Sequence, residues 1–233
     1  METPTLILLP GMDGTGALFD PFVAAIGSNM TTRIVRYPAE QDLGYAELEE
    51  MARDALPEEG SYIILGESFS GPIAVSLAAA ADARLKGLIL CCSFVRSPRR
   101  IGAWLKRGVM IPPLSMLPQA VIDFVLLGRF RTPALSAELR RAISRVRPQV
   151  FRRRLREVLN VDVTDQLKAV GVPVLYLRAS DDRVVSSAAS GLVKEIAPQT
   201  HMIGIEAPHC LLQAAPGEAA AAVMRFVDTE CDG

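Results

Sequence analysis

The sequence has no strong excess of charge and no long apolar run, and these absences exclude several classes of protein. Its 233 residues carry a net charge of −1 and half of them are apolar, which excludes a disordered chain and a strongly basic nucleic-acid binder. No run approaches the ~18 apolar residues of a membrane helix. The first apolar run follows residues without basic charge and is too short for a signal peptide. We therefore expect a globular cytoplasmic protein.

Cysteine is also scarce, and its positions do not have the spacing of metal ligands. Two of the cysteines are adjacent and end an apolar run, where small side chains are usually buried. We therefore expect buried thiols, with neither a disulfide framework nor a metal site. The four residues are Cys91, Cys92, Cys210 and Cys231.

Outside the middle of the chain, short apolar runs alternate with amphipathic segments. Strands that alternate with helices are typical of a parallel sheet covered on both faces, so we expect a doubly wound, mainly parallel α/β fold. The expected strands are Leu6–Leu9, Arg33–Tyr37, Tyr62–Leu65, Gly87–Cys91, Val172–Leu177 and Thr200–Ile205. The expected helices are Ala17–Gly27, Tyr45–Leu56, Pro72–Ala81, Ala188–Ile196 and Ala215–Val227.

Residues 96–160 break this alternation. They contain several helix-like pieces separated by prolines and no convincing strand. Fifteen Lys and Arg stand against three acidic residues, a net charge of +12, which leaves −13 on the rest of a chain with net charge −1. We therefore divide the chain into residues 1–95, a basic helical insertion at 96–160, and residues 161–233. Solvated helix faces explain such arginines, and so does attraction of an acidic partner. No nucleic-acid-binding module accompanies them.

A serine stands at an expected strand-to-helix junction. The run Tyr62–Leu65 ends at Gly66, Ser68 follows, and an alanine-rich segment begins near Pro72. Small residues on both sides permit a sharp, strained turn that exposes the hydroxyl at the edge of the sheet. Ser68 is therefore a candidate nucleophile, which requires a base and a group that orients that base.

The search for the base is short because the chain has only two histidines. His201 falls at the start of the sixth expected strand, where we expect a structural role, whereas His209 follows that strand. Ligand chemistry in doubly wound sheets gathers at the carboxyl ends of the strands, so His209 is the candidate base. A carboxylate after the fifth strand would orient it, and both Asp181 and Asp182 stand there. Either could instead cap the following helix.

These motifs resemble those of the α/β-hydrolase superfamily, and the overall plan is similar to capped esterases that cleave acyl-carrier-protein methyl esters. The segment Gly66–Gly71 resembles the nucleophile elbow, the loop Pro10–Gly14 resembles the oxyanion loop, and the order Ser, Asp, His is that of the superfamily. The resemblance implies a sheet that lacks the first two strands of the superfamily, with six strands in the order 2-1-3-4-5-6 of this chain's count. It also implies that residues 96–160 form a helical cap.

The resemblance implies roles for individual residues. It favours Asp182 over Asp181 as the acid, because Asp182 stands directly before the stretch Arg183–Val185. Ser68 would attack an ester carbonyl, and His209 would take the proton and return it to the leaving alcohol. No metal or organic cofactor is required.

Two backbone N–H groups, those of Met12 and Phe69, would bind the oxyanion in this scheme. The chain departs from the superfamily pattern at two places nearby. Pro10 replaces a histidine of the oxyanion loop, and Ser70 replaces the second glycine of the elbow, where we expect it to be a small packing residue. Neither departure removes a reacting group.

We expect a carboxylesterase that acts on esters of small to medium acyl chains. A thioesterase, an acyltransferase or a perhydrolase would use the same residues, and a non-catalytic ligand receptor would use the same fold. The basic insertion would attract an acidic partner such as an acyl carrier protein, acyl-CoA or anionic lipid. Apolar residues of the insertion would line an acyl pocket or pack only on each other. They are Trp104, Leu105, Met110, Leu114, Met116, Leu117, Phe124, Leu126 and Leu127.

Overall fold

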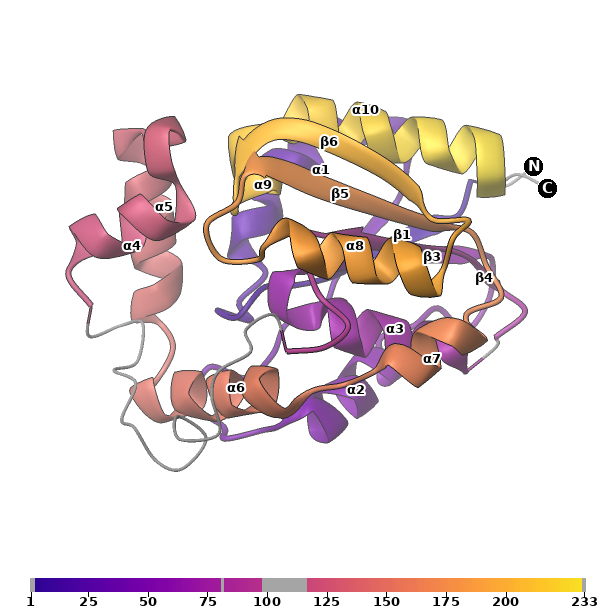
Figure 1. Cartoon of the computed structure of the whole chain (residues 1–233), viewed down its shortest axis with the longest axis horizontal. Coiled ribbons are helices and arrows are strands. Elements are labelled where there is room, and N and C mark those ends of the chain that lie inside the picture. Colours follow the sequence, from indigo (N-terminus) through magenta and orange to yellow (C-terminus); the bar gives the residue numbers. More distant parts are fainter. Residues whose placement is uncertain (1–2, 81, 98–116, 232–233) are drawn as a thin grey trace.

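A sheet of six parallel strands forms the centre of the protein (Figure 1). The computed structural model describes residues 3–80, 82–97 and 117–231. The strand order is β2-β1-β3-β4-β5-β6, which confirms the order and direction predicted for the sheet. The strands are β1 (Thr5–Leu9), β2 (Thr32–Ile34), β3 (Tyr62–Glu67), β4 (Leu85–Cys91), β5 (Val174–Asp181) and β6 (His201–Pro208).

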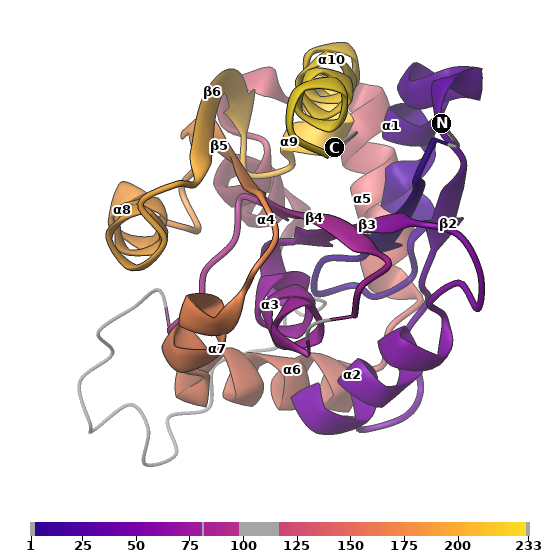
Figure 2. The ribbon, with the colours of Figure 1, turned by 90° about the vertical axis from the view of Figure 1, so that its right-hand side faces the viewer.

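Helices cover both faces of the sheet, which is why β1 and β3 are continuous apolar runs. In Figure 2, α1 and α10 lie on one face, whereas α2, α3, α7 and α8 lie on the other. In the described parts of the chain, no helix is long and apolar enough to cross a membrane. The helices of the two faces are α1 (Asp20–Ile26), α2 (Tyr45–Asp54), α3 (Gly71–Ala79), α7 (Thr164–Ala169), α8 (Ser187–Ile196), α9 (Leu211–Ala214) and α10 (Pro216–Phe226).

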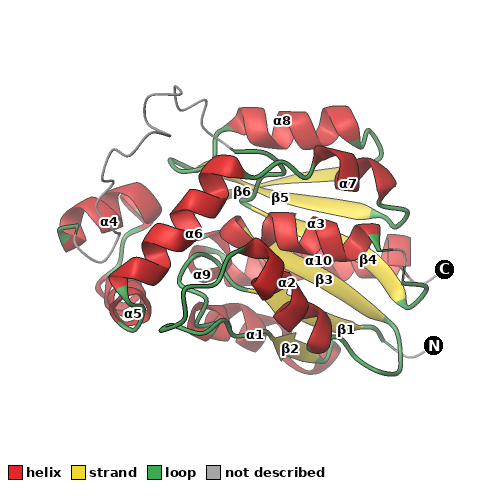
Figure 3. Ribbon diagram, turned by 90° about the horizontal axis from the view of Figure 1, so that it is seen from below, coloured by secondary structure: helices red, strands yellow, loops and turns green. Residues whose placement is uncertain are grey.

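Among the residues that the structure describes, three helices besides α7 lie between β4 and β5 in the chain. They are α4 (Gln119–Leu126), α5 (Pro133–Ser144) and α6 (Pro148–Asn160). Pro133 and Pro148 occupy the first turns of α5 and α6, where a missing N–H costs nothing. The three helices share a separate apolar cluster and lie beside the end of the sheet at which the strands finish (Figures 1 and 3). The division of the chain at residues 95 and 160 stays a prediction.

Some boundaries differ from those expected, for identifiable reasons. The second strand ends at Ile34, because Tyr37 N–H donates to the Gly14 carbonyl of a loop instead of continuing the ladder. The last expected helix is α10, which begins at Pro216 in place of Ala215, and an unexpected short helix, α9, precedes it. Strands β5 and β6 run further than expected, since their pairing continues to Asp181 and Pro208.

All four cysteines are buried, as predicted. Cys91 is the last residue of β4 and Cys92 follows it, and Cys210 and Cys231 lie in the apolar clusters. They therefore act as small apolar side chains of the core.

Candidate active site

The elbow after β3 has the strained geometry that its small residues predict. Ser68 has a φ of +48°, a left-handed conformation that is uncommon for a residue with a side chain. Gly66 is required because a Cβ there would lie 2.8 Å from the Ser70 carbonyl oxygen and 2.7 Å from the Ala74 Cβ. The turn therefore holds the Ser68 hydroxyl at the carboxyl end of β3, where α3 begins.

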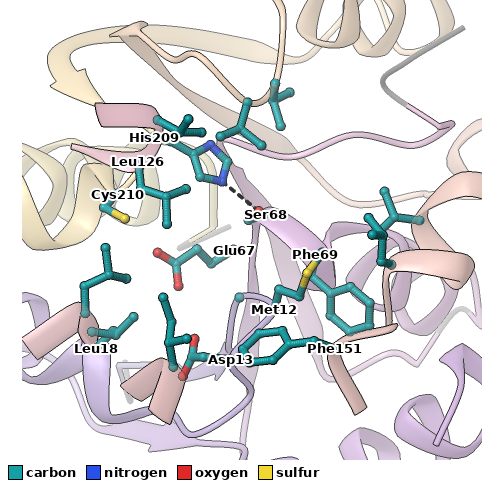
Figure 4. Close-up of a pocket in the computed structure, with 18 of the residues that line it drawn as sticks. Met12, Asp13, Leu18, Glu67, Ser68, Phe69, Leu126, Phe151, His209 and Cys210 are labelled. Atoms are coloured by element: carbon teal, nitrogen blue, oxygen red, sulfur yellow. Dashed lines mark hydrogen bonds between the residues drawn. The ribbon is translucent and has the colours of Figure 1, made fainter. Parts of the chain in front are cut away.

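Three side chains from separate loops form one hydrogen-bonded chain. Ser68 Oγ lies 2.9 Å from His209 Nε2 (Figure 4), and His209 Nδ1 lies 2.9 and 3.0 Å from the two carboxylate oxygens of Asp182. An ionised carboxylate can only accept, so Nδ1 carries the ring hydrogen and Nε2 is free to accept the hydrogen of the Ser68 hydroxyl. The structure thus brings together the three residues that the sequence singled out.

Asp182 is held as a buried carboxylate by the turn that follows it. Its Oδ1 accepts hydrogen bonds from the N–H groups of Val184 and Val185, both at 2.8 Å. Burial raises the pKa of Asp182, but these donors and His209 outweigh that effect and leave the pKa below its ordinary value. Asp182 is therefore ionised near neutral pH, as a partner for an imidazolium must be.

The two alternative residues lie elsewhere. The Asp181 carboxylate accepts from Arg129 Nε at 2.7 Å and does not face His209. His201 opens β6 at the opposite end of that strand, where its half-exposed ring lies 3.5 Å from Glu230 and edge-on to Phe226. Neither residue is part of the hydrogen-bonded chain.

The loop from Pro10 to Gly14 is held by its own turn and by the elbow. Gly14 N–H donates to the Gly11 carbonyl at 3.0 Å. In a trans peptide the N–H points away from the carbonyl, so this bond sets the direction of the Met12 N–H. Ser70 Oγ donates to the Pro10 carbonyl and lies 3.1 Å from the Tyr37 hydroxyl. Ser70 is therefore more than a packing residue, since it joins the elbow to this loop.

Ser93, which the sequence did not single out, orients the other expected oxyanion donor. Its hydroxyl donates to the Ser68 carbonyl, and the same peptide carries the Phe69 N–H on its opposite side. Gly71 leaves room for this contact, because a Cβ there would lie 1.8 Å from Ser93 Oγ. Tyr45 holds the next peptide by donating to the Phe69 carbonyl at 2.9 Å, and its ring stacks on that of Phe69. No local motif marks either residue.

A largely apolar cavity of about 320 Å³ opens beside Ser68 and His209 (Figure 4). Helices α4, α5 and α6 supply much of its wall, and Met12 and Phe69 line it close to Ser68. The wall residues from the three helices include Val125, Leu126, Leu139, Ile143, Phe151 and Leu155. Such a cavity fits an acyl chain with its carbonyl at Ser68.

The apolar residues expected to line this pocket divide into three groups. Leu117 and Leu126 do line it. Leu127 is buried against the neighbouring cluster, and the expectation for Phe124 is wrong, because its ring is 65% exposed and lies 4.2 Å from the Arg183 guanidinium carbon. The remaining five lie outside the described residues: Trp104, Leu105, Met110, Leu114 and Met116.

Glu67, directly before the candidate nucleophile, is a buried acid in the cavity wall that the sequence gave no reason to expect. Burial raises its pKa to about 7, against the lowering effect of a hydrogen bond from Gln213 Nε2 at 2.9 Å, while the nearby charge of Asp13 raises it further. Figure 4 shows both acids on the same side of the cavity. Glu67 and Asp13 thus place two carboxyl groups in a largely apolar cavity wall.

One group of donor atoms in the described residues has the compactness of a metal site. A ligand atom from each of Cys92, Asp182 and His209 lies within 4.8 Å of the others. Two of these residues already hydrogen-bond each other through the ring nitrogen and the carboxylate that a metal would need. The arrangement present is therefore that of a proton-transfer chain.

Comparison with known proteins places the chain in a family. A family model described as "Serine aminopeptidase, S33" matches residues 42–205. Pimeloyl-[acyl-carrier protein] methyl ester esterase of Nitrosomonas europaea is 26% identical over 230 residues, which cover 89% of this chain and 88% of that protein. Phytyl ester synthase 1, a chloroplastic protein of Arabidopsis thaliana, is 30% identical over 127 residues, which cover 51% of this chain but 17% of that protein.

The fold has counterparts among solved structures. The enol-lactonase of Burkholderia xenovorans superposes with a TM-score of 0.82 at 16% identity, covering 98% of this chain and 92% of the other. This similarity confirms the α/β-hydrolase architecture expected from the motifs, and the family model spans most of the chain. The chain therefore belongs to the serine aminopeptidase S33 family and is an α/β-hydrolase of the esterase type, an enzyme of the carboxylic ester hydrolase class.

Proposed function

We propose that this protein hydrolyses carboxylic esters of small to medium acyl chains through an acyl-enzyme on Ser68. The observation that carries the proposal is the hydrogen-bonded chain from Ser68 through His209 to Asp182, which opens onto an apolar cavity. A nucleophile, a base and an orienting carboxylate in contact are what acyl transfer to water requires.

In the proposed reaction, His209 Nε2 takes the hydroxyl proton as Ser68 Oγ attacks the ester carbonyl. Asp182, which is ionised, stabilises the imidazolium that forms. The imidazolium then donates its proton to the leaving alkoxide, which departs as the alcohol. In the second half, His209 removes a proton from water, the hydroxide attacks the acyl-enzyme, and Ser68 recovers its proton as the acid leaves.

The backbone N–H groups of Met12 and Phe69 are the proposed oxyanion donors. The bonds from Gly14 N–H to the Gly11 carbonyl and from Ser93 to the Ser68 carbonyl support this role, because they orient both donor peptides before the substrate binds. Donors that are already in place stabilise the developing charge without reorganisation. Loss of one such donor costs ~10²–10³ in rate.

We further propose that the ester is presented by an acidic carrier, and that the 96–160 insertion forms the cap on which it docks. The relative from Nitrosomonas europaea is named for an ester on acyl carrier protein. Several arginines on α5 and α6, and one directly after α5, are exposed and form no ion pair within the described residues: Arg140, Arg141, Arg145, Arg152 and Arg156. A positive surface beside the cavity would steer an acidic protein toward Ser68. Buried thiols such as those of Cys91, Cys92 and Cys210 fit a reducing compartment, so we expect the cytoplasm.

Acyl transfer to an alcohol is the second candidate, because one relative is named as an ester synthase. It shares the acyl-enzyme and differs only in the acceptor. Purified protein incubated with a donor ester and a long-chain alcohol would give mainly free acid if hydrolysis is the function, and mainly the new ester if transfer is.

The central test is a panel of p-nitrophenyl esters of increasing chain length, with wild type and Ser68→Ala. We expect turnover by wild type, highest for small to medium chains, and a loss of about 10⁴-fold or more in Ser68→Ala. Ser144→Ala, which removes an exposed hydroxyl that bonds only the Arg141 carbonyl of its own helix, is the control for nonspecific damage. Activity that survives in Ser68→Ala would exclude this mechanism. A wild type without turnover of any ester, thioester or amide would favour a receptor.

A further inference from the structure

Arg154 of α6 is the largest fully buried side chain in the described parts of the protein, and the proposed chemistry does not use it. It is 1% exposed and forms no ion pair among the described residues. Its partners are backbone carbonyls instead. Nη1 donates to the carbonyl oxygens of Met12 and Asp13, both at 2.9 Å, and Nη2 donates to that of Pro38 at 3.0 Å. A buried arginine directed at main-chain atoms holds a backbone conformation.

Two of these carbonyls belong to the loop that carries the Met12 N–H. The peptide before Met12 is oriented by the bond from Gly14 N–H to the Gly11 carbonyl. The peptide after Met12 is oriented by Arg154, whose Nη1 donates to the Met12 carbonyl. Because the two peptides on either side of Met12 are both held, its φ and ψ are held as well. The direction of its N–H is then set before any substrate arrives.

Gly14 shows that the loop is shaped around the guanidinium. A Cβ at Gly14 would lie 2.5 Å from Arg154 Nη1, and its φ of +71° also favours glycine. Arg154 shares the buried face of α6 with Phe151 and Val158, which line the cavity. Helix α6 of the 96–160 insertion therefore both lines the cavity and holds the loop beside Ser68.

We propose that Arg154 is a positioning residue for the oxyanion loop, through which α6 sets the direction of the Met12 N–H. This inference rests on the oxyanion role proposed above for Met12. Arg154 does not touch the substrate; it acts through the peptide that it holds. Lysine does not replace it, because a single ammonium on a flexible stem cannot hold three carbonyls in the fixed plane of a guanidinium.

The experiment compares Arg154→Lys and Arg154→Met with Arg33→Met, which changes an exposed arginine that also donates to a backbone carbonyl, that of Ala55 at 3.0 Å. The substrate is p-nitrophenyl acetate, and phenylboronic acid serves as an inhibitor that forms a tetrahedral adduct with the nucleophilic serine. We expect kcat to fall about 10- to 100-fold in both Arg154 variants, with KM within about 3-fold. The affinity for phenylboronic acid should fall by the same factor as kcat. Arg33→Met should match wild type in kcat, KM and boronate affinity.

The proposal is overturned if folded Arg154 variants, verified by circular dichroism and thermal unfolding, keep kcat and boronate affinity within about 3-fold of wild type. It is also overturned if KM rises while kcat is unchanged, because Arg154 would then support binding of the substrate in its ground state. If Arg154→Met does not fold, the kinetics of Arg154→Lys decide the proposal. If Arg154→Lys does not fold either, Arg154 is required for folding and the positioning role is rejected. Failure of the proposed function gives a different result from failure of this inference, because in that case wild type itself turns over no ester.

Discussion

The carboxylate of Asp181 lies 2.7 Å from the Nε atom of Arg129, a residue of the segment between β4 and β5. Arg129 also pairs with Glu206 at 2.9 Å. Asp181 is thus bonded to this arginine, whereas the next carboxylate, Asp182, accepts from His209 Nδ1. Two adjacent and chemically identical side chains thus have different partners.

The first prediction separates these two aspartates. Asp182→Asn should lower kcat about 10³- to 10⁴-fold, because an amide does not stabilise the imidazolium and can favour the wrong tautomer of His209. Asp181→Asn should change kcat by less than about 3-fold, since a partly exposed ion pair contributes little. Steady-state rates on one p-nitrophenyl ester, with unfolding curves for both variants, make the comparison. The assignment of the acid is wrong if Asp181→Asn causes the larger loss.

The second prediction concerns the glycine against the Arg154 guanidinium. Gly14→Ala should reduce the free energy of unfolding by more than the ~1–2 kcal/mol of a left-handed alanine, because its Cβ would also displace Arg154. Gly60→Ala is the matched control: its φ of +76° is similar, but no atom lies within 4 Å of the added Cβ. Urea unfolding of both variants measures the difference. Equal losses would mean that the loop has room for the methyl group.

The third prediction follows from the raised pKa of Glu67. The folded protein holds the Glu67 proton up to about pH 7, whereas the unfolded chain releases it near 4.5, so the folded state binds more protons between these values. This residue's contribution to stability therefore falls as pH rises from about 4.5 to 7, by about 3 kcal/mol in total. Asp13 and His209 face the same carboxyl and shift its titration in opposite directions.

Glu67→Gln removes this dependence. The stability of the variant relative to wild type should therefore increase between pH 5 and pH 8, by an amount on the order of the ~3 kcal/mol lost by wild type. Urea unfolding at four pH values for both proteins tests it. If the free energies of unfolding of the two proteins differ by the same amount at every pH in this range, Glu67 titrates near its ordinary pKa in the folded protein.

The fourth prediction tests docking of an acidic carrier. For a methyl ester on acyl carrier protein, kcat/KM should fall steeply as salt rises from about 0.05 to 0.5 M, because screening weakens attraction between exposed charges. The combined change of Arg140, Arg141 and Arg145 to Gln should reduce both the rate and its salt dependence. Arg147→Gln, which breaks a pair with Glu40, is the control. A free methyl ester that responds to salt as the carrier-bound ester does would exclude steering.

Much of the fold follows from local patterns. Continuous apolar runs such as Ile63–Leu65 predict strands buried on both faces, and glycine and proline mark where they end. The sheet order was predicted through the family resemblance. The ends of elements were less predictable, because contacts distant in sequence set them. Tyr37, expected to end the second strand, lies beyond β2 and bonds Gly14, and Pro208 belongs to β6 through its pairing with Asp181.

The sequence by itself determined the candidate residues of the site, because the elbow around Ser68 and the scarcity of histidine are visible in a linear chain. Their catalytic roles stay predictions. The family resemblance favoured Asp182 over Asp181, and only the tertiary structure shows the partner of each carboxylate: Asp182 bonds His209, whereas Asp181 bonds Arg129.

The residues that support the site were also beyond the sequence. Ser93, Ser70 and Arg154 bond backbone carbonyls that lie 25 to 142 positions away in the chain. Because every residue carries the same backbone carbonyl group, no pattern of side chains in the sequence predicts such a contact. The local sequence therefore determines which groups are able to react, and the packing of distant segments decides which peptide groups are held in place around them.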